Sequence, residues 1–265
     1  AHLKMKVVSG VVSIITGLVT CLALSYFVLF LNNWQPSPSL PSIDHKPQAI
    51  ASLLLVPSSP TANNILLMLL FTLPHTLITF ESVKRLLINY LLCSEKKYYL
   101  LFYSFWASVS LLFLYTFWSP STSEVWSIRL NWAALAVHAL QGIFLILYLY
   151  SLLSTEILGN FGLVWFVKST LGLSKIKKEK GGKENKLVIS GIYGVVRHPL
   201  MTCTIAMMWL TPTMTIGHLF LAALFTLYIV LAVRFSEEPK LIKEYGIAYT
   251  NYQRKVPCQL IPGIY

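Results

Sequence analysis

The apolar residues of this 265-residue chain fall in long blocks, and this feature most constrains its fold. A helix needs about 20 apolar residues to cross the hydrocarbon core of a bilayer. Charged residues make up only 12% of the chain, about half of what is usual for a soluble domain. The sequence therefore predicts an integral membrane protein. Its first four spans are expected at Val7–Leu31, Asn64–Phe80, Tyr98–Trp118 and Trp132–Leu153.

A fifth apolar stretch, Leu200–Phe235, is too long for one span and is interrupted by Thr211-Pro212-Thr213. This pattern predicts a helical hairpin. The first arm would hold about 12 residues and extend roughly 18 Å, which is too short to cross a bilayer. Short helices are tolerated at membrane depth where they line a cavity. The expected fold class is all-α: a multi-span transmembrane helical bundle of about six helices, with this hairpin at its C-terminal end.

Composition divides the chain into three segments. Residues 1–63 hold the first span and a Pro- and Ser-rich loop, whose composition is typical of an exposed loop. Residues 64–174 hold helices 2 to 4 and a Gly-broken apolar piece, Glu156–Leu173, expected at the membrane interface. Residues 175–265 hold the Lys/Gly/Glu run Lys175–Lys186, expected to be a flexible loop, followed by the hairpin and a set of polar motifs.

The net charge of +11 is distributed unevenly between the two sides of this topology. With the N-terminus inside, the outer loops hold only Lys46 and Arg129 of the 21 basic residues. Cytoplasmic loops of membrane proteins carry such an excess, so both termini are expected to be cytoplasmic or nucleoplasmic. Basic loops of this kind contact the lipid bilayer, and no nucleic acid is expected as a partner.

The four cysteines are far apart and form no Cys-x-x-Cys pair. Neither a zinc site nor a disulfide framework is indicated, and no metal is expected.

Two polar clusters flank the apolar hairpin. Arg197-His198 precede it, and Glu237-Glu238 follow it. Because a hairpin brings its two ends together, these clusters are expected to meet at the same membrane face. Pro199 suits the first turn of a helix, which places Arg197 and His198 at a helix N-terminus, an end that favours anions.

An anion-binding helix end opposite a carboxylate pair can hold a zwitterionic ligand with an amino-acid end and a sulfonium. S-adenosylmethionine has this chemistry. Ion pairs at the membrane edge with no ligand explain the same spacing equally well, since structural ion-pair networks are common.

The full pattern resembles the isoprenylcysteine and phospholipid methyltransferase superfamily of membrane enzymes. It consists of Gly-x-Tyr-x-x-x-Arg-His-Pro over residues 191–199, the apolar hairpin, Glu-Glu, and Tyr-Gly-x-x-Tyr-x-x-Tyr-x-x-x-Val-Pro over residues 245–257. The resemblance implies an S-adenosylmethionine site on the cytoplasmic side of the bundle. The cofactor-binding residues that it implies are Tyr193, Arg197, His198, Pro199, Glu237, Glu238, Tyr249 and Tyr252.

Within the superfamily, the chain is most similar to the methanethiol S-methyltransferases and the nurims. The likeness runs from about Phe71 to Pro262 and is carried by residues 74–84, 160–163, 209–219 and 227–228. It implies a methyltransferase acting on a small or lipophilic acceptor, with a thiol favoured. The alternative is a nurim-like inner nuclear membrane protein with a structural role and no catalysis. In a eukaryote, the expected location is the endoplasmic reticulum or inner nuclear membrane.

Two further ionisable residues are candidates for catalysis. His75 follows Pro74 inside the second span, and ionisable side chains at membrane depth are often functional. A neutral histidine bonded to a neighbouring helix is the open alternative. Glu156 ends the fourth span, where it can act as a base or contact substrate. As a charge that reaches out of the membrane at a span end, it would need no function.

Overall fold

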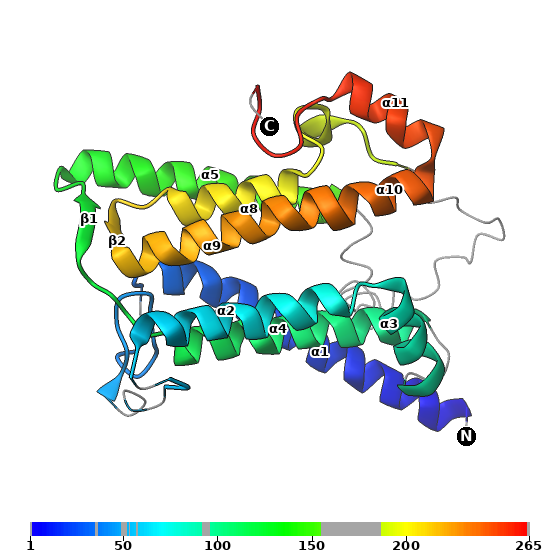
Figure 1. Ribbon diagram of the computed structural model, residues 1–265, viewed down its shortest axis with the longest axis horizontal. Helices are drawn as coiled ribbons and strands as arrows, with labels where there is room; N and C mark the ends of the chain where they lie inside the picture. The colour runs from blue at the N-terminus through cyan, green and yellow to red at the C-terminus, as the bar shows by residue number, and fades with distance from the viewer. Residues whose placement is uncertain are drawn as a thin grey trace. The chain divides into compact units, whose positions relative to one another are not determined.

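The computed structural model describes residues 2–34, 37–48, 52, 54–56, 58–91, 96–154 and 187–263. These residues form two compact units, shown in Figure 1. Unit 1 holds the described residues up to 122, and unit 2 holds residues 123–154 and 187–263. Four helices are long and apolar enough to cross a membrane, and a bent helix pair is a possible fifth span. The predicted all-α, multi-span fold is confirmed. The segments predicted at Glu156–Leu173 and Lys175–Lys186 lie outside the described residues.

Unit 1 is built on three long helices, α1 (His2–Leu31), α2 (Pro60–Leu77) and α4 (Lys96–Phe117). Helix α4 packs against both of the others. A short helix, α3 (Glu81–Leu86), and one π-helical turn, η2 (Leu87–Leu91), follow α2 at an angle of 70°. The three long helices match the first three predicted spans to within a few residues.

Two asparagines at the start of α2 donate hydrogen bonds to backbone carbonyls at, and just after, the end of α4. The Nδ2 group of Asn63 donates to the carbonyl of Phe117 at 3.0 Å, and that of Asn64 donates to the carbonyl of Ser119 at 2.8 Å. The last carbonyls of a helix have no partner inside the helix, so an apolar setting requires such donors. Helix α2 itself starts at Ser59, whose side chain accepts a hydrogen bond from the Ala62 N–H, with Pro60 in the first turn.

Part of the Pro- and Ser-rich loop is tightly folded rather than simply exposed. Asn33, in a left-handed conformation with φ of 55°, accepts a hydrogen bond from Ser42 at 2.7 Å and donates to Asp44 at 2.7 Å. Ser42 and Ile43 are both buried. Composition predicted exposure here, but the side-chain contacts of Asn33 close the loop over the end of α1.

Unit 2 contains the predicted hairpin. Helices α5 (Asn131–Ser154), α8 (Pro199–Trp209) and α9 (Ile216–Ala232) run side by side, with α8 packed against the other two (Figure 1). The first arm, α8, has 11 residues, close to the expected 12. Periodicity did not indicate the small antiparallel ribbon of β1 (Glu124–Ser127) and β2 (Thr213–Thr215), which forms at the hairpin turn.

Side chains from neighbouring helices satisfy the backbone where α8 stops short. Gln141 on α5 donates to the carbonyl of Met207 at 2.9 Å, and Nε2 of His218 on α9 donates to the carbonyl of Met208 at 2.9 Å. Irregular backbone is tolerated at membrane depth only when it is buried in protein and hydrogen-bonded. These two buried polar residues therefore provide donors for the last carbonyls of this short helix.

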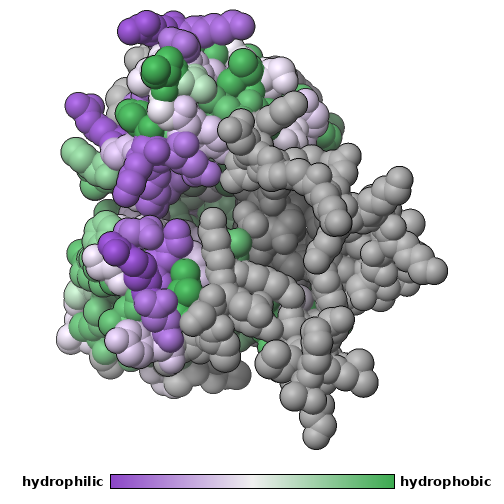
Figure 2. All heavy atoms as spheres, turned by 90° about the vertical axis from the view of Figure 1, so that its right-hand side faces the viewer, coloured by the Kyte–Doolittle hydropathy of each residue, from purple (hydrophilic) through white to green (hydrophobic). Residues whose placement is uncertain are grey.

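The second arm of the hairpin continues beyond α9. One π-helical turn, η5 (Val233–Glu237), joins it to α10 (Glu238–Tyr245), so that residues 216–245 form one helical rod. A turn at Gly246, with φ of 55°, leads into α11 (Ile247–Lys255). Figure 2 shows hydrophilic side chains gathered at this end of unit 2, which is suited to contact with water.

Candidate functional site

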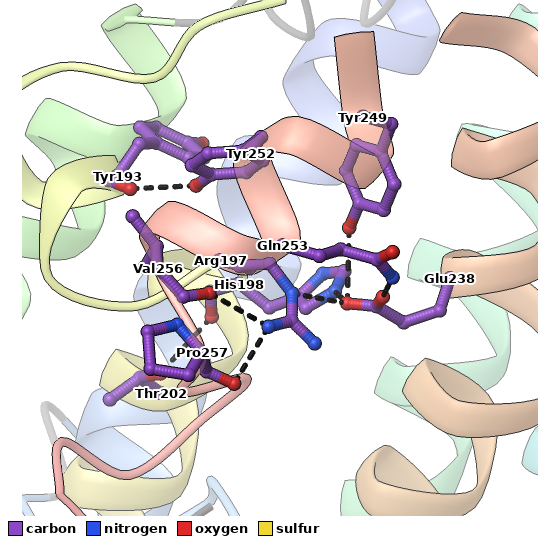
Figure 3. A network of polar contacts seen from close by, with 10 residues as sticks. All are labelled: Tyr193, Arg197, His198, Thr202, Glu238, Tyr249, Tyr252, Gln253, Val256 and Pro257. Carbon is purple, nitrogen blue, oxygen red and sulfur yellow. Dashed lines mark hydrogen bonds and ion pairs between the residues drawn. The ribbon is translucent and has the colours of Figure 1, made fainter. Parts of the chain in front are cut away.

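The carboxylate of Glu238 collects four side-chain donors at one end of unit 2 (Figure 3). Its Oε1 accepts from Arg197 Nε at 2.9 Å, His198 Nε2 at 2.8 Å and the Tyr249 hydroxyl at 3.0 Å. Its Oε2 accepts from Gln253 Nε2 at 2.5 Å. Arg197 and His198 directly precede α8, Glu238 begins α10, and the other two residues lie on α11. The two ends of the hairpin therefore meet, as the sequence predicted.

The ion pair at the centre of this network is buried. The side chains of Arg197 and Glu238 are each 6% exposed, and that of His198 is 9% exposed. Charges removed from water are tolerated when they are paired and their remaining hydrogen-bonding groups are satisfied. The neighbouring Tyr249 and Gln253 provide that satisfaction for the carboxylate.

Backbone carbonyls orient the guanidinium of Arg197 from its other side. Nη1 donates to the carbonyls of Val256 at 2.8 Å and Pro257 at 2.7 Å. A guanidinium has five N–H donors, of which Nε and Nη1 carry three. The remaining nitrogen, Nη2, takes part in none of these three bonds, and in Figure 3 it points away from both carbonyls.

We call residues Val256–Leu260 the C-terminal strap, because five consecutive carbonyls of this segment accept hydrogen bonds from Arg197–Thr202. Beyond the two bonds to Nη1, the backbone N–H of Arg197 donates to Cys258 and that of His198 donates to Gln259, both at 3.0 Å. The Thr202 hydroxyl donates to the carbonyl of Leu260 at 2.6 Å. The strap thus fixes the backbone just before α8 as well as the Arg197 side chain.

A glycine packs against α5 where the site approaches that helix. Gly191 has a φ of +63°, and a Cβ atom at this position would lie 2.8 Å from the Tyr150 hydroxyl. Two residues later, the Tyr193 hydroxyl is hydrogen-bonded to Ser151 at 2.9 Å. The carbonyl of Tyr193 accepts from the Tyr252 hydroxyl at 2.6 Å. The glycine of the Gly-x-Tyr motif is thus needed for close packing.

Both tyrosines of α11 that were predicted to contact cofactor are buried, Tyr249 at 1% exposure and Tyr252 at 4%. They pack with Val256. Burial, together with the adjacent Glu238 carboxylate, raises the pKa of Tyr249 above its ordinary value. Burial raises the pKa of Tyr252 to about 12. Both phenols therefore stay protonated and act as hydrogen-bond donors.

Glu237 stands apart from this network. Its side chain is 39% exposed and pairs with Lys240 at 3.2 Å. Consecutive residues of a helix point in different directions, so Glu237 and Glu238 face different surroundings. Pro199 lies in the first turn of α8, as predicted, and is buried there.

Sequence reasoning missed Gln253 and the carbonyls of the strap. Gln253 follows Tyr249 by four residues, and helical residues at this spacing share a face. That spacing was a usable signal for Gln253. The strap carbonyls carry no signal in the sequence, because every residue has a carbonyl.

Of the two candidate catalytic residues, the structure describes only His75. His75 belongs to unit 1, where its Nε2 is 2.7 Å from the Tyr103 hydroxyl and its ring stacks on Phe71. This contact with a neighbouring helix agrees with the alternative in which His75 is a neutral, structural histidine. A catalytic role for His75 stays a prediction. Glu156 lies outside the described residues.

The family model described as phospholipid methyltransferase matches residues 132–248, which include most of α5, Arg197, His198 and Glu238. No solved structure matches the chain at a significant level.

Curated relatives extend the similarity beyond that segment. Methanethiol S-methyltransferase 2 of Bradyrhizobium diazoefficiens is 32% identical over 204 residues, covering 76% of this chain and 73% of that protein. Methanethiol S-methyltransferase of Crocosphaera subtropica is 29% identical over 264 residues, covering 96% and 91%. Nurim of Danio rerio is 25% identical over 225 residues, covering 82% and 75%. The chain therefore belongs to the phospholipid methyltransferase-like family of membrane proteins that includes these methanethiol S-methyltransferases and nurim.

Proposed function

We propose that this protein is an S-adenosylmethionine-dependent methyltransferase of the membrane, acting on a small or lipophilic acceptor, with a thiol favoured. The observation that carries the proposal is the buried guanidinium of Arg197. Three of its N–H groups are held by Glu238, Val256 and Pro257, while the two on Nη2 take part in none of these bonds. Such a pre-oriented cation suits the carboxylate of an amino-acid ligand.

The residues around Arg197 fit the rest of such a ligand. His198 and Arg197 lie before the first turn of α8, and the positive end of a helix dipole adds to the attraction for an anion. Glu237, which is 39% exposed, can meet the amino group or the sulfonium. We propose the complete cofactor site as the eight residues that the family resemblance implied, Tyr193, Arg197, His198, Pro199, Glu237, Glu238, Tyr249 and Tyr252.

When bound, S-adenosylmethionine supplies an electrophilic methyl group, which an acceptor sulfur can take while the donor sulfur keeps the electron pair of the broken carbon–sulfur bond. The chain contributes positioning, which can supply a large part of the rate acceleration. An apolar surrounding excludes water and favours a reaction in which opposite charges are neutralised. We propose that His75 or Glu156 assists loss of the thiol proton.

Similarity to the methanethiol S-methyltransferases favours a small thiol as acceptor. Similarity to nurim over 82% of the chain favours a second candidate, a structural protein of the inner nuclear membrane. Under either proposal, both termini face the cytoplasm or nucleoplasm, the site lies on that side, and the endoplasmic reticulum or inner nuclear membrane is the location in a eukaryote.

Calorimetric titration of the detergent-purified protein with S-adenosylmethionine and S-adenosylhomocysteine tests the proposal. We expect saturable binding of both. We expect much weaker binding of 5′-methylthioadenosine, which lacks the amino-acid end that Arg197 would contact. Methyl transfer is then measured with methanethiol and a long-chain alkyl thiol as acceptors. If the folded protein binds neither cofactor form, the methyltransferase proposal fails and the structural role is the better account.

A further inference from the structure

The two adjacent glutamates differ in how much of their hydrogen-bonding capacity is left. A carboxylate has about four acceptor positions. Oε1 of Glu238 already accepts from three side chains and Oε2 accepts from Gln253. These four donors match the number of acceptor positions, and the residue is 5% exposed, so solvent hardly reaches it.

The charge of Glu238 is also largely compensated inside the protein. Arg197 Nε and His198 Nε2 contact the same oxygen at 2.9 and 2.8 Å. A second cation brought to this carboxylate would have to compete with a buried guanidinium that has no other carboxylate partner among the described residues. Glu237, by contrast, makes only an exposed ion pair with Lys240, and such pairs contribute little free energy.

We propose that Glu238 is a positioning residue, held by Tyr249 and Gln253, that orients Arg197 and His198 toward the ligand carboxylate, while Glu237 alone meets the cationic end of the ligand. This inference rests on the proposed function, because it assigns separate tasks to the two glutamates of the same site. Gln253 is a positioning residue one step further away, since its side-chain amide donates to the carboxylate of Glu238.

Three ligands separate the two tasks. S-adenosylhomocysteine carries both the carboxylate and the amino group, its decarboxylated analogue keeps only the amine, and its deaminated analogue keeps only the carboxylate. Calorimetric affinities are measured for each ligand with the unsubstituted protein, Glu238→Gln and Glu237→Gln. These two variants are matched, since each replaces one neighbouring carboxylate by an amide of the same shape.

We expect Glu238→Gln to lower the affinity for S-adenosylhomocysteine and its deaminated analogue about tenfold or more. This is the effect of losing one hydrogen bond to a charged group. The same variant should leave the affinity for the decarboxylated analogue unchanged within about threefold. Glu237→Gln should lower the affinity for the two ligands that carry an amino group, S-adenosylhomocysteine and its decarboxylated analogue. It should leave the affinity for the deaminated analogue unchanged. A general loss of structure would weaken all three ligands equally, so this selectivity reports positioning.

Gln253→Ala and Tyr249→Phe each remove one donor to Glu238 and serve if Glu238→Gln does not fold. Both should show a smaller loss with the same preference for carboxylate-bearing ligands. The inference is overturned if Glu238→Gln or these variants lower the affinity for the decarboxylated ligand and leave that for the deaminated ligand unchanged. It is also overturned if they change the three affinities to the same extent. If the unsubstituted protein binds no ligand, the proposed function itself fails. If it binds the ligands but the variants show no such selectivity, only the division of tasks between the two glutamates fails.

Discussion

The Nε group of Arg197 donates to Oε1 of Glu238 at 2.9 Å, although 41 residues separate them in the sequence. This bond closes the hairpin of α8 and α9 at the end opposite the β1–β2 ribbon (Figure 1). It joins the element before α8 to the first residue of α10, so every change to it should affect both fold and site.

Replacing Glu238 by Ala should lower the free energy of unfolding by about 3–5 kcal/mol, because Arg197 would be left buried without its carboxylate. Thermal unfolding of the purified protein in detergent, without ligand, measures this. Glu237→Ala is the control, since its exposed pair with Lys240 should contribute less than about 1 kcal/mol. Equal losses for the two variants would show that Glu238 is not the centre of the network.

Gly191→Ala should destabilise the site by about 1–2 kcal/mol from the left-handed backbone alone, with more from the contact with Tyr150. Gly194→Ala provides a matched control three residues away. A Cβ there would meet only the Ile189 carbonyl, at 3.8 Å, and its φ is not positive. We expect a lower unfolding temperature for the first variant and little change for the second. The reverse order would contradict the packing described for Gly191.

Ending the chain after Lys255 removes the strap and with it five acceptors of Arg197–Thr202. Each buried donor left without a partner costs about 1–3 kcal/mol, so the truncated protein should unfold at a markedly lower temperature. A chain ending after Pro262 keeps all five carbonyls and should match the 265-residue protein. Thr202→Val removes one strap bond, to Leu260, together with the hydroxyl's bond to the His198 carbonyl, and should lie between them.

Tyr252 should make stability depend on pH in the alkaline range. Burial raises its pKa to about 12 in the folded protein, while the unfolded chain titrates near 10. The unfolded state therefore loses this proton first, and the stability contribution is complete below about pH 10 and is lost as pH rises toward about 12. Unfolding temperatures from pH 8 to pH 11.5 are compared with those of Tyr252→Phe.

The variant loses the hydrogen bond to Tyr193 at every pH, so it should be the less stable protein near pH 8. The difference should shrink as pH rises, because only the unsubstituted protein has this phenol to ionise. Lysines titrate in the same range but are common to both proteins. A difference in unfolding temperature that stays constant with pH would mean that folding does not shift the pKa of the Tyr252 phenol.

The spans could be read directly from the chain. The predicted Trp132–Leu153 became α5 at Asn131–Ser154, and the break at Thr211-Pro212-Thr213 became the hairpin turn. The meeting of Arg197 with Glu238 also followed, because a hairpin requires its ends to be close. Composition and periodicity did not predict three features of the fold. These are the closure of the loop by Asn33, the ribbon at the hairpin turn, and the hydrogen bonds from Gln141 and His218 to the end of α8.

By itself, the sequence determined which segments enter the membrane and which polar residues flank the hairpin, because hydropathy is a local property summed over about 20 neighbouring residues. Only the tertiary structure decided that Glu238 is enclosed while Glu237 is exposed, and that strap carbonyls hold Arg197. Those assignments depend on the direction and distance of groups up to 60 residues apart, and hydrogen bonds form only when both are met.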